Sequence, residues 1–89
     1  MQITFDPAKD KLNRRKHGIS LAEAARFDWS SAVIWPDMRR DYREPRMIGL
    51  GMIAHRLHAM VFVERNGVLR IISLRKANIR EDKRYARQT

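Results

Sequence analysis

The chain has 89 residues, no cysteine and a formal net charge of +9 at pH 7. This length suits a single domain over residues 1–89 with one modest core, and the lack of cysteine excludes a disulfide framework and a thiolate metal site. The chain does not open with a basic leader and has no run of about eighteen apolar residues, so we expect a soluble cytoplasmic protein with no membrane partner.

Arginine supplies 14 of the 19 basic residues. Its guanidinium group is a planar fork of donors that fits phosphate in a bidentate manner. A strongly basic small domain of this kind points to nucleic acid as the partner. A generally basic surface is the simpler alternative, and an acidic membrane surface is disfavoured because no helix combines a long apolar face with a basic one.

The first third of the chain predicts a short strand and two helices. The strand is expected at residues 3–5, and the first helix begins after the cap Asp6 and ends at Gly18. Ser20 and Glu23 have the spacing of a capping box, which predicts a second short helix that ends near residue 27.

The middle of the chain predicts two strands and a charged connection. An edge strand is expected at residues 31–35, where Pro36 stops it, and residues 37–45 form the connection most expected to be mobile. Residues 47–53 read as a strand whose two glycines indicate a bulge or a close approach of other backbone.

The last third predicts a β-hairpin and a helix. Asn66-Gly67 has the composition of a two-residue type I′ turn between strands at residues 57–65 and 68–75. With that turn, Glu64 is expected opposite Leu69 and His58 opposite Arg75, on one face of the hairpin. Asn78 and Glu81 resemble a second capping box, which opens a helix that ends near residue 87.

The predicted fold is therefore α+β, with two N-terminal helices, an antiparallel sheet of about four strands and a C-terminal helix. The hairpin contains charges that strand pairing does not need, namely Glu64, Arg65, Arg70, Arg75 and Lys76. The four basic residues among them indicate a polyanionic partner. In the final helix Arg80, Arg84 and Arg87 follow at spacings of four and three, so we expect one stripe that is either a solvated face or a phosphate contact.

Three further side chains have both a structural and a functional interpretation. His17 lies beside the helix end, where it either interacts with the helix dipole or takes part in acid–base or phosphate chemistry. Glu64 is either an ion-pair partner of Arg65 or a general base. Tyr85 is either a residue at the rim of the core or a proton donor. We expect no metal or other cofactor, because His55 and His58 would project to opposite sides of a strand.

Several strings of the sequence together resemble the BrnT family of bacterial type II toxins. The most specific are Lys16-His17-Gly18-Ile19-Ser20 and Arg70-Ile71-Ile72-Ser73-Leu74-Arg75-Lys76-Ala77, accompanied in the family's order by Phe5-Asp6-Pro7-Ala8-Lys9, Asn13, Glu23-Ala24, Glu44, Arg46, Glu64-Arg65, Glu81 and Tyr85. Two features depart from the family pattern: Leu21 stands where an aromatic residue is usual, and the connection at residues 37–45 is individual to this chain.

The resemblance implies a RelE-like microbial ribonuclease fold, RNA cleavage that inhibits translation, and neutralisation by a BrnA-like ribbon-helix-helix antitoxin. DNA would be engaged only indirectly, through the antitoxin. RNA cleavage without a metal needs a base for the 2′-hydroxyl, cations that stabilise the phosphorane, and an acid for the leaving 5′-oxygen.

We assign charge stabilisation to Arg46, Arg65 and Arg75, the base to Glu64, and the acid to His17 or Tyr85. The expected RNA-binding residues are Lys16, Arg70, Lys76, Arg80 and Arg84. The alternative is a non-catalytic basic module that binds RNA or DNA and is regulated by a protein partner. Such a binder would tolerate exchange of arginine for lysine, whereas a catalytic fork would lose cleavage and keep affinity. An inactive or attenuated relative of the family is a third possibility.

Overall fold

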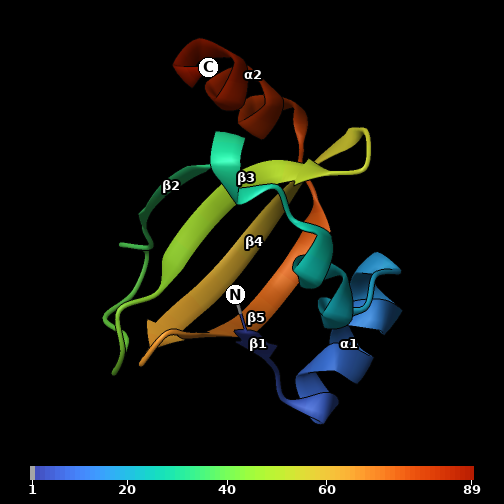
Figure 1. Ribbon diagram of the computed structural model, residues 1–89, viewed down its shortest axis with the longest axis vertical. Coiled ribbons are helices and arrows are strands. Elements are labelled where there is room, and N and C mark those ends of the chain that lie inside the picture. The colour runs from blue at the N-terminus through green and yellow to red at the C-terminus, as the bar shows by residue number, and fades with distance from the viewer. Residues whose placement is uncertain (1) are drawn as a thin grey trace.

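The computed structural model describes residues 2–89 and contains a five-stranded sheet with helices at its edge and end (Figure 1). In chain order the elements are β1 (Gln2–Thr4), α1 (Pro7–His17), the 3-10 helices η1 (Leu21–Arg26) and η2 (Trp29–Ser31), β2 (Val33–Pro36), β3 (Met47–Ile53), β4 (Arg56–Arg65), β5 (Val68–Lys76) and α2 (Ile79–Gln88). The strands are arranged in the order β1-β5-β4-β3-β2. None of the helices in residues 2–89 is long and apolar enough to cross a membrane.

Helix α1 begins and ends where the sequence predicts. The Asp6 carboxylate accepts a hydrogen bond from the Ala8 N–H at 2.9 Å and thereby caps the first turn. Gly18 ends the helix with a φ of 72°, in the left-handed region that glycine adopts without steric cost.

The second predicted helix is a 3-10 helix. In a 3-10 helix side chains three residues apart lie above one another, and the buried residues Leu21, Ala24 and Phe27 have this spacing. The geometry therefore directs all three side chains to the sheet. Ser20 caps η1 by accepting from the Ala22 N–H at 3.1 Å, while Glu23 pairs with Arg26, so the reciprocal capping box predicted here does not form.

The sheet has five strands and is mixed, so the prediction of about four antiparallel strands is wrong. Strand β1 pairs in parallel with the first residues of β5, from Gln2 opposite Val68 to Thr4 opposite Arg70. The remaining pairs are antiparallel. The physical reason is that the outer edge of β5 presents unpaired backbone groups, and the N-terminal strand satisfies those next to the turn.

Asn13 of α1 covers the same edge farther along β5. Its side-chain amide donates to the Leu74 carbonyl at 2.7 Å and accepts from the Leu74 N–H at 3.2 Å, as a neighbouring strand would. The same amide donates to the Ile19 carbonyl at 2.9 Å. The buried Asn13 side chain therefore fixes α1 against β5, the strand that contains Arg70, Arg75 and Lys76.

The β4–β5 hairpin has the predicted turn, but its register changes at a bulge. Asn66 and Gly67 have φ values of 53° and 79°, as a type I′ turn requires. Glu64 lies opposite Leu69 as predicted. The register then shifts between Val61 and Phe62, so Arg75 lies opposite Ala59, and the predicted pairing of Arg75 with His58 is wrong. A bulge reverses the alternation of the strand beyond it.

The bulge allows β5 to contribute both to the core and to the opposite face. Leu74 becomes fully buried beside Met60, while Arg75 projects from the other side of the sheet. Without the extra residue, the apolar pattern of β5 would not match that of β4 over the whole hairpin. A one-residue shift of this kind depends on long-range packing, which the hairpin sequence alone does not reveal.

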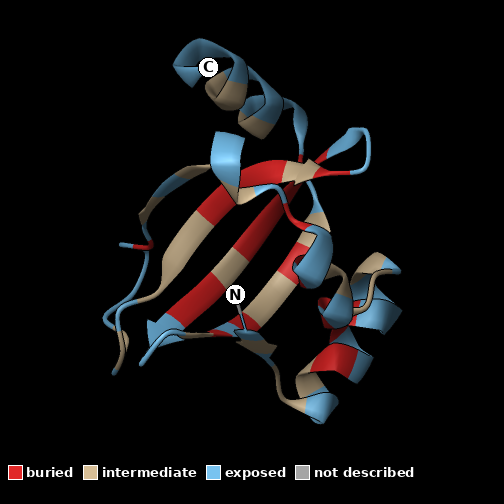
Figure 2. Ribbon diagram, viewed as in Figure 1, coloured by how far each residue is buried: buried red, intermediate tan, exposed pale blue. Residues whose placement is uncertain are grey.

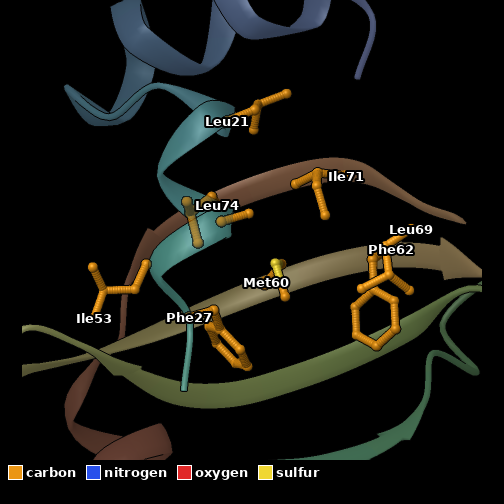
Figure 3. Packing of buried hydrophobic residues seen from close by; sticks show 9 residues of the cluster. Leu21, Phe27, Ile53, Met60, Phe62, Leu69, Ile71 and Leu74 are labelled. Atoms are coloured by element: carbon orange, nitrogen blue, oxygen red, sulfur yellow. The ribbon is translucent and has the colours of Figure 1, made fainter. Parts of the chain in front are cut away.

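The main core lies between the sheet and the 3-10 helices, where Leu21 and Phe27 pack against Met60, Phe62 and Leu74 (Figure 3). Gly51 of β3 faces the Phe27 ring so closely that an added Cβ would lie 2.3 Å from its Cζ atom. The close approach predicted for the strand glycines therefore occurs at Gly51, where an aromatic ring and not backbone makes it, whereas an added Cβ at Gly49 would have ordinary contacts. A smaller cluster lies beneath α2 on the opposite face and is formed by Leu50, Leu57, Ala59 and Ala77 with Trp35, Met52 and Tyr85.

Helix α2 contacts the sheet through one side and has no buried residue (Figure 2). Its predicted capping box is confirmed, because Asn78 accepts from the Glu81 N–H and Glu81 accepts from the Asn78 N–H, each at 2.9 Å. The helix lies at the far end of the sheet from the β4–β5 turn (Figure 1). Helix α2 therefore does not cover the part of this sheet face that lies near the β4–β5 turn.

Candidate nucleic-acid interface

The predicted arginines gather on the sheet face opposite the main core. Arg65 of β4 and Arg70 and Arg75 of β5 project from this face, which we call the arginine face. Arg46 joins them from the residue that precedes β3. The alternation of side chains places Arg65 and Arg70 there, and the bulge places Arg75 there.

A pocket of about 460 Å³ lies on the arginine face, and we call it the basic pocket. Its floor is apolar and consists of Val63 and Ile72. Five cations and two carboxylates lie around this floor: Lys9, Arg40, Arg43, Arg46, Arg70, Asp41 and Glu44. The excess of positive charge over an apolar floor suits a ligand that has both a phosphate and a flat apolar part.

Two further hollows adjoin the basic pocket and continue its charge. A hollow of about 210 Å³ toward the β4–β5 turn shares Arg70 with it and adds Arg65. A groove of about 470 Å³ between α1 and β5 shares Lys9 and Ile72 with it and is also lined by Lys16, His17 and Ser73. We call these three connected hollows the basic track.

Asp37 organises the segment that forms one wall of the basic pocket. Its buried carboxylate accepts hydrogen bonds from Arg39 at 2.7 and 2.8 Å and from the Tyr42 hydroxyl at 3.0 Å. The hydrogen bonds from Arg39 outweigh burial and hold the Asp37 pKa well below its ordinary value. The Asp37 N–H also donates to the Arg46 carbonyl at 2.8 Å, so the segment is closed at both ends.

Arg46 stacks on Tyr42 within the basic pocket. The guanidinium carbon lies 4.3 Å from the centre of the tyrosine ring, a cation–π arrangement. Asp37 holds the Tyr42 hydroxyl and thereby orients the ring on which the Arg46 guanidinium stacks. The sequence predicts a role for Arg46 but gives no indication of its aromatic neighbour.

Two of the predicted charge stabilisers are paired with carboxylates. Arg65 pairs with Glu44. Arg75 donates two hydrogen bonds to Glu81, at 2.7 and 2.8 Å. Burial raises the Glu81 pKa, but the hydrogen bonds from Arg75 and from the Asn78 N–H act against it, and the net pKa lies below the ordinary value.

His17 lies at the end of α1, in the groove that continues the basic pocket. Its side chain is half-buried, and this burial lowers the His17 pKa below 6.5. The positive charges of Lys16 and Arg75 lower it further. These effects favour the neutral imidazole, the form that accepts a proton, over the charged form.

Glu64 and Lys76 lie apart from the arginine face. Glu64 projects from the core side of β4, beside an apolar hollow that Trp29, Met47 and Phe62 help to line. Lys76 is exposed opposite His58 on the same side of the sheet. The structure therefore brings neither residue together with the four arginines.

The predicted stripe on α2 is divided between two environments. Arg84 packs over the Trp35 ring, with its guanidinium carbon 3.6 Å from the ring centre. Arg80 and Arg87 are exposed on the outer side together with Lys83. Tyr85 packs on the second cluster and donates its hydroxyl to the Ser31 carbonyl at 3.1 Å. Arg84 and Tyr85 thus attach α2 to the rest of the fold, and Arg80 and Arg87 face solvent.

Several pocket residues were not predicted from the sequence, notably Lys9, Arg40, Tyr42 and Arg43. A signal existed for Lys9, since Lys9, Asn13 and Lys16 follow at helical spacings of four and three and so share one side of α1. The connection has no periodic pattern, so nothing in its sequence places Arg40, Tyr42 or Arg43 over β4 and β5.

The arrangement supplies guanidinium and ammonium groups of the kind that bind phosphate, and one imidazole with a lowered pKa. Within residues 2–89 no group of three or more His, Asp or Glu side chains is placed to hold a metal ion. Fixed guanidinium groups stabilise negative charge that develops on a bound phosphate, because they need no reorganisation during the reaction.

Comparison with known proteins identifies one family. Residues 5–81 match the family model described as the ribonuclease toxin BrnT of type II toxin–antitoxin systems. No curated protein matches the chain.

Proposed function

We propose that this chain, which belongs to the BrnT family of ribonuclease toxins of type II toxin–antitoxin systems, cleaves RNA by attack of a 2′-hydroxyl on the adjacent phosphate. The reaction needs no metal ion, and cleavage inhibits translation in the cytoplasm. The observation that carries this proposal is the convergence of Arg46 and Arg70 on one pocket whose adjoining groove contains His17.

Each arginine has a place in this chemistry. Arg46, in the basic pocket, stabilises the negative charge that develops on the phosphorane, and Arg65 supports it from the turn end of the basic track. Arg75 lies on the same face but lines none of the three hollows, and we assign it the same role from the side of His17, whose pKa its charge lowers. Lys16 and Arg70 bind neighbouring phosphates of the backbone. Arg84 packs over the Trp35 ring outside the basic track, so Arg84, Arg80 and Lys76 would meet only RNA that continues beyond the track.

His17 is the best-placed group for proton transfer. Its lowered pKa leaves it neutral and ready to accept the proton of the 2′-hydroxyl. Glu64, the base predicted from the sequence, faces the other side of the sheet, so a phosphate bound by the arginines would not lie beside it. The leaving 5′-oxygen takes its proton from Tyr85, whose hydroxyl would exchange its hydrogen bond to the Ser31 carbonyl for one to that oxygen, or otherwise from solvent water.

Family membership implies an antitoxin partner, and we propose a BrnA-like ribbon-helix-helix protein that also provides the link to DNA. Its toxin-binding segment would neutralise the basic track and should therefore be acidic. A structure of the complex tests this directly. A bound antitoxin that left Arg46, Arg65 and Arg75 exposed to solvent would contradict the proposed mode of neutralisation.

The alternative of a non-catalytic binding module is favoured by one observation, the pairing of Arg65 with Glu44 and of Arg75 with Glu81. A guanidinium group that is paired with a carboxylate still binds phosphate, but the net charge of the ion pair is lower than that of the guanidinium group alone. The two functions differ in their response to Arg75→Lys. A binder would lose affinity only modestly, whereas the ribonuclease would lose cleavage and keep its affinity for RNA.

The experiment that tests the ribonuclease proposal compares purified wild-type protein with Arg75→Ala on total RNA in EDTA. We expect wild-type cleavage that leaves 2′,3′-cyclic phosphate ends, and intact RNA with Arg75→Ala. Arg87→Ala is the matched control, because Arg87 is an exposed arginine on the outer side of α2. Intact RNA with wild-type protein, together with salt-sensitive binding, would support the non-catalytic module.

A further inference from the structure

The basic pocket is larger and more varied in chemistry than a phosphate contact requires. We propose that it is a subsite for one whole nucleotide of the RNA, next to the scissile phosphate, and that the stacked pair of Tyr42 and Arg46 is the platform for its base. This inference rests on the proposed function and adds a determinant of sequence preference to it.

The size and lining of the pocket fit a nucleotide. Its volume of about 460 Å³ lies in the range of about 300–1,000 Å³ that is typical of small-ligand sites. Val63 and Ile72 provide an apolar floor on which a ribose or a base edge can rest. A bare phosphate would gain nothing from these two side chains, so the apolar floor argues for a ligand with an organic part.

The charges around the pocket suit the two phosphates that flank a nucleotide. Lys9 lines both the basic pocket and the groove beside α1. Arg70 lines both the basic pocket and the hollow near the β4–β5 turn. Arg40 and Arg43 come from the opposite wall. Glu44 is paired with Arg65 and therefore offsets less of the positive charge inside the pocket.

Tyr42 is the aromatic residue that lines the pocket, and its position is fixed. Asp37 holds its hydroxyl at 3.0 Å, and the Arg46 guanidinium covers one side of its ring at 4.3 Å. Proteins hold unstacked RNA bases on aromatic rings and on guanidinium planes. A ring and a guanidinium already stacked on each other present such a surface without further ordering.

The platform belongs to the connection at residues 37–45 together with the residue that follows it. Tyr42 would act by positioning the substrate and not by chemistry, so its replacement should change where the RNA binds and is cut more than the rate of the chemical step.

Binding to RNA that cannot be cleaved tests this inference independently of the ribonuclease activity. The probes are fluorescent single-stranded oligonucleotides with 2′-O-methyl groups, and a set of them has one abasic position moved along the chain. With wild-type protein we expect one position at which loss of the base weakens affinity by about 5- to 150-fold, the usual effect of losing one stacked base. A uniform response along the oligonucleotide would overturn the inference and leave a phosphate-only site.

Two variants of Tyr42 test whether the base at that position of the oligonucleotide stacks on the platform. Tyr42→Leu removes the ring and should lose affinity for the intact oligonucleotide by about the same factor, with no further loss at the abasic position. Tyr42→Phe keeps the ring and should retain the position-specific loss. Circular dichroism and the affinity for an oligonucleotide abasic throughout report whether Tyr42→Leu keeps its fold and its phosphate contacts.

The outcomes separate this inference from the proposed function. If RNA binds with a position-specific base requirement but all-ribose RNA is not cleaved, the subsite stands and the ribonuclease proposal fails. If all-ribose RNA is cleaved but Tyr42→Leu binds and cuts like wild type, the subsite is wrong and the ribonuclease proposal stands. If Tyr42→Leu weakens neutralisation by the antitoxin but leaves RNA binding and cleavage unchanged, the inference is wrong and the pocket binds the antitoxin instead.

Discussion

Arg75 and Glu81 are joined by two hydrogen bonds of 2.7 and 2.8 Å, which connect the last strand of the sheet to the first turn of α2. The same Glu81 carboxylate accepts the Asn78 N–H and completes the capping box of that helix. Glu81 therefore orients the Arg75 fork while it also fixes the start of α2. This carboxylate therefore links the arginine face to the helix that borders it.

Arg75→Ala should abolish toxicity without unfolding the protein. Loss of one fixed charge stabiliser typically reduces turnover by about 100- to 1,000-fold. The Arg75 side chain is 37 % exposed, so solvent screens its ion pair and the free energy of unfolding should fall by only about 1 kcal/mol. Single-turnover cleavage and urea denaturation measure the two effects separately.

Glu81→Gln is the companion variant for Arg75→Ala. It keeps a side-chain carbonyl for the Asn78 N–H but removes the negative charge that orients Arg75. We expect a smaller loss of cleavage than with Arg75→Ala, together with a nearly unchanged helix. Equal losses of stability and activity in both variants would show that Arg75 acts mainly by attaching α2.

The acidic limb of the pH–rate profile should lie below pH 6.5 if His17 is the base. Burial and the charges of Lys16 and Arg75 lower the His17 pKa, so the neutral, proton-accepting form persists to lower pH than in a free histidine. Cleavage should stay constant above the ordinary value of 6.5 and fall only as the pH drops through the lowered pKa. His17→Asn should remove this limb, and an unchanged limb in that variant would exclude His17 as the group that titrates.

Four local signals predicted the ends of α1 and of the hairpin strands and the start of α2, whereas the Ser20–Glu23 capping box does not form and β2 includes Pro36, which was expected to stop it. Asp6, Gly18, Asn78 and the Asn66-Gly67 turn each act on backbone groups within a few residues, so their effect does not depend on the rest of the fold. The parallel strand β1 and the bulge in β5 depend on segments that are distant in sequence, and neither has a local signal.

The same distinction applies to the candidate site. Arg65 and Arg70 were predictable on one face because a strand alternates its side chains near a defined turn. The placement of Arg75 opposite Ala59 required the bulge. The place of Tyr42 depends on how the connection packs against β4 and β5, which no spacing within the connection reveals. Spacing puts Lys9 on the side of α1 that carries Asn13 and Lys16, but the packing of α1 against β5 is what brings it to the basic pocket.

Asn13→Ala should destabilise the fold strongly for a change of one polar side chain. It removes three hydrogen bonds and leaves the Leu74 N–H and carbonyl unpaired at the edge of β5. We expect the free energy of unfolding to fall by about 2–4 kcal/mol. Urea denaturation measures this loss, with Leu12→Ala as the control, because Leu12 is the neighbouring side chain and is 61 % exposed. Similar small effects in both variants would show that Asn13 does not hold α1 to the strand.

Gly51→Ala and Gly49→Ala form a matched pair on β3. A Cβ at position 51 would lie 2.3 Å from the Phe27 ring, whereas a Cβ at position 49 would lie 3.4 Å from its nearest neighbour, in the Phe62 ring. Overpacking should cost Gly51→Ala about 1–3 kcal/mol of unfolding free energy, and Gly49→Ala should be close to wild type. Thermal denaturation of both variants measures the difference. Equal stabilities would mean that Phe27 does not pack over Gly51.

The central claim, RNA cleavage by attack of a 2′-hydroxyl at the arginine face, is tested most directly on one RNA oligonucleotide with a mapped cut site. The measurement compares this RNA in EDTA with a copy that has a single 2′-deoxynucleotide immediately 5′ of the cut. Our account predicts cleavage of the first, with a 2′,3′-cyclic phosphate end, and no cleavage of the second at that position. Cleavage of the deoxy copy at the same position, or cleavage only when a divalent metal is added, would contradict it.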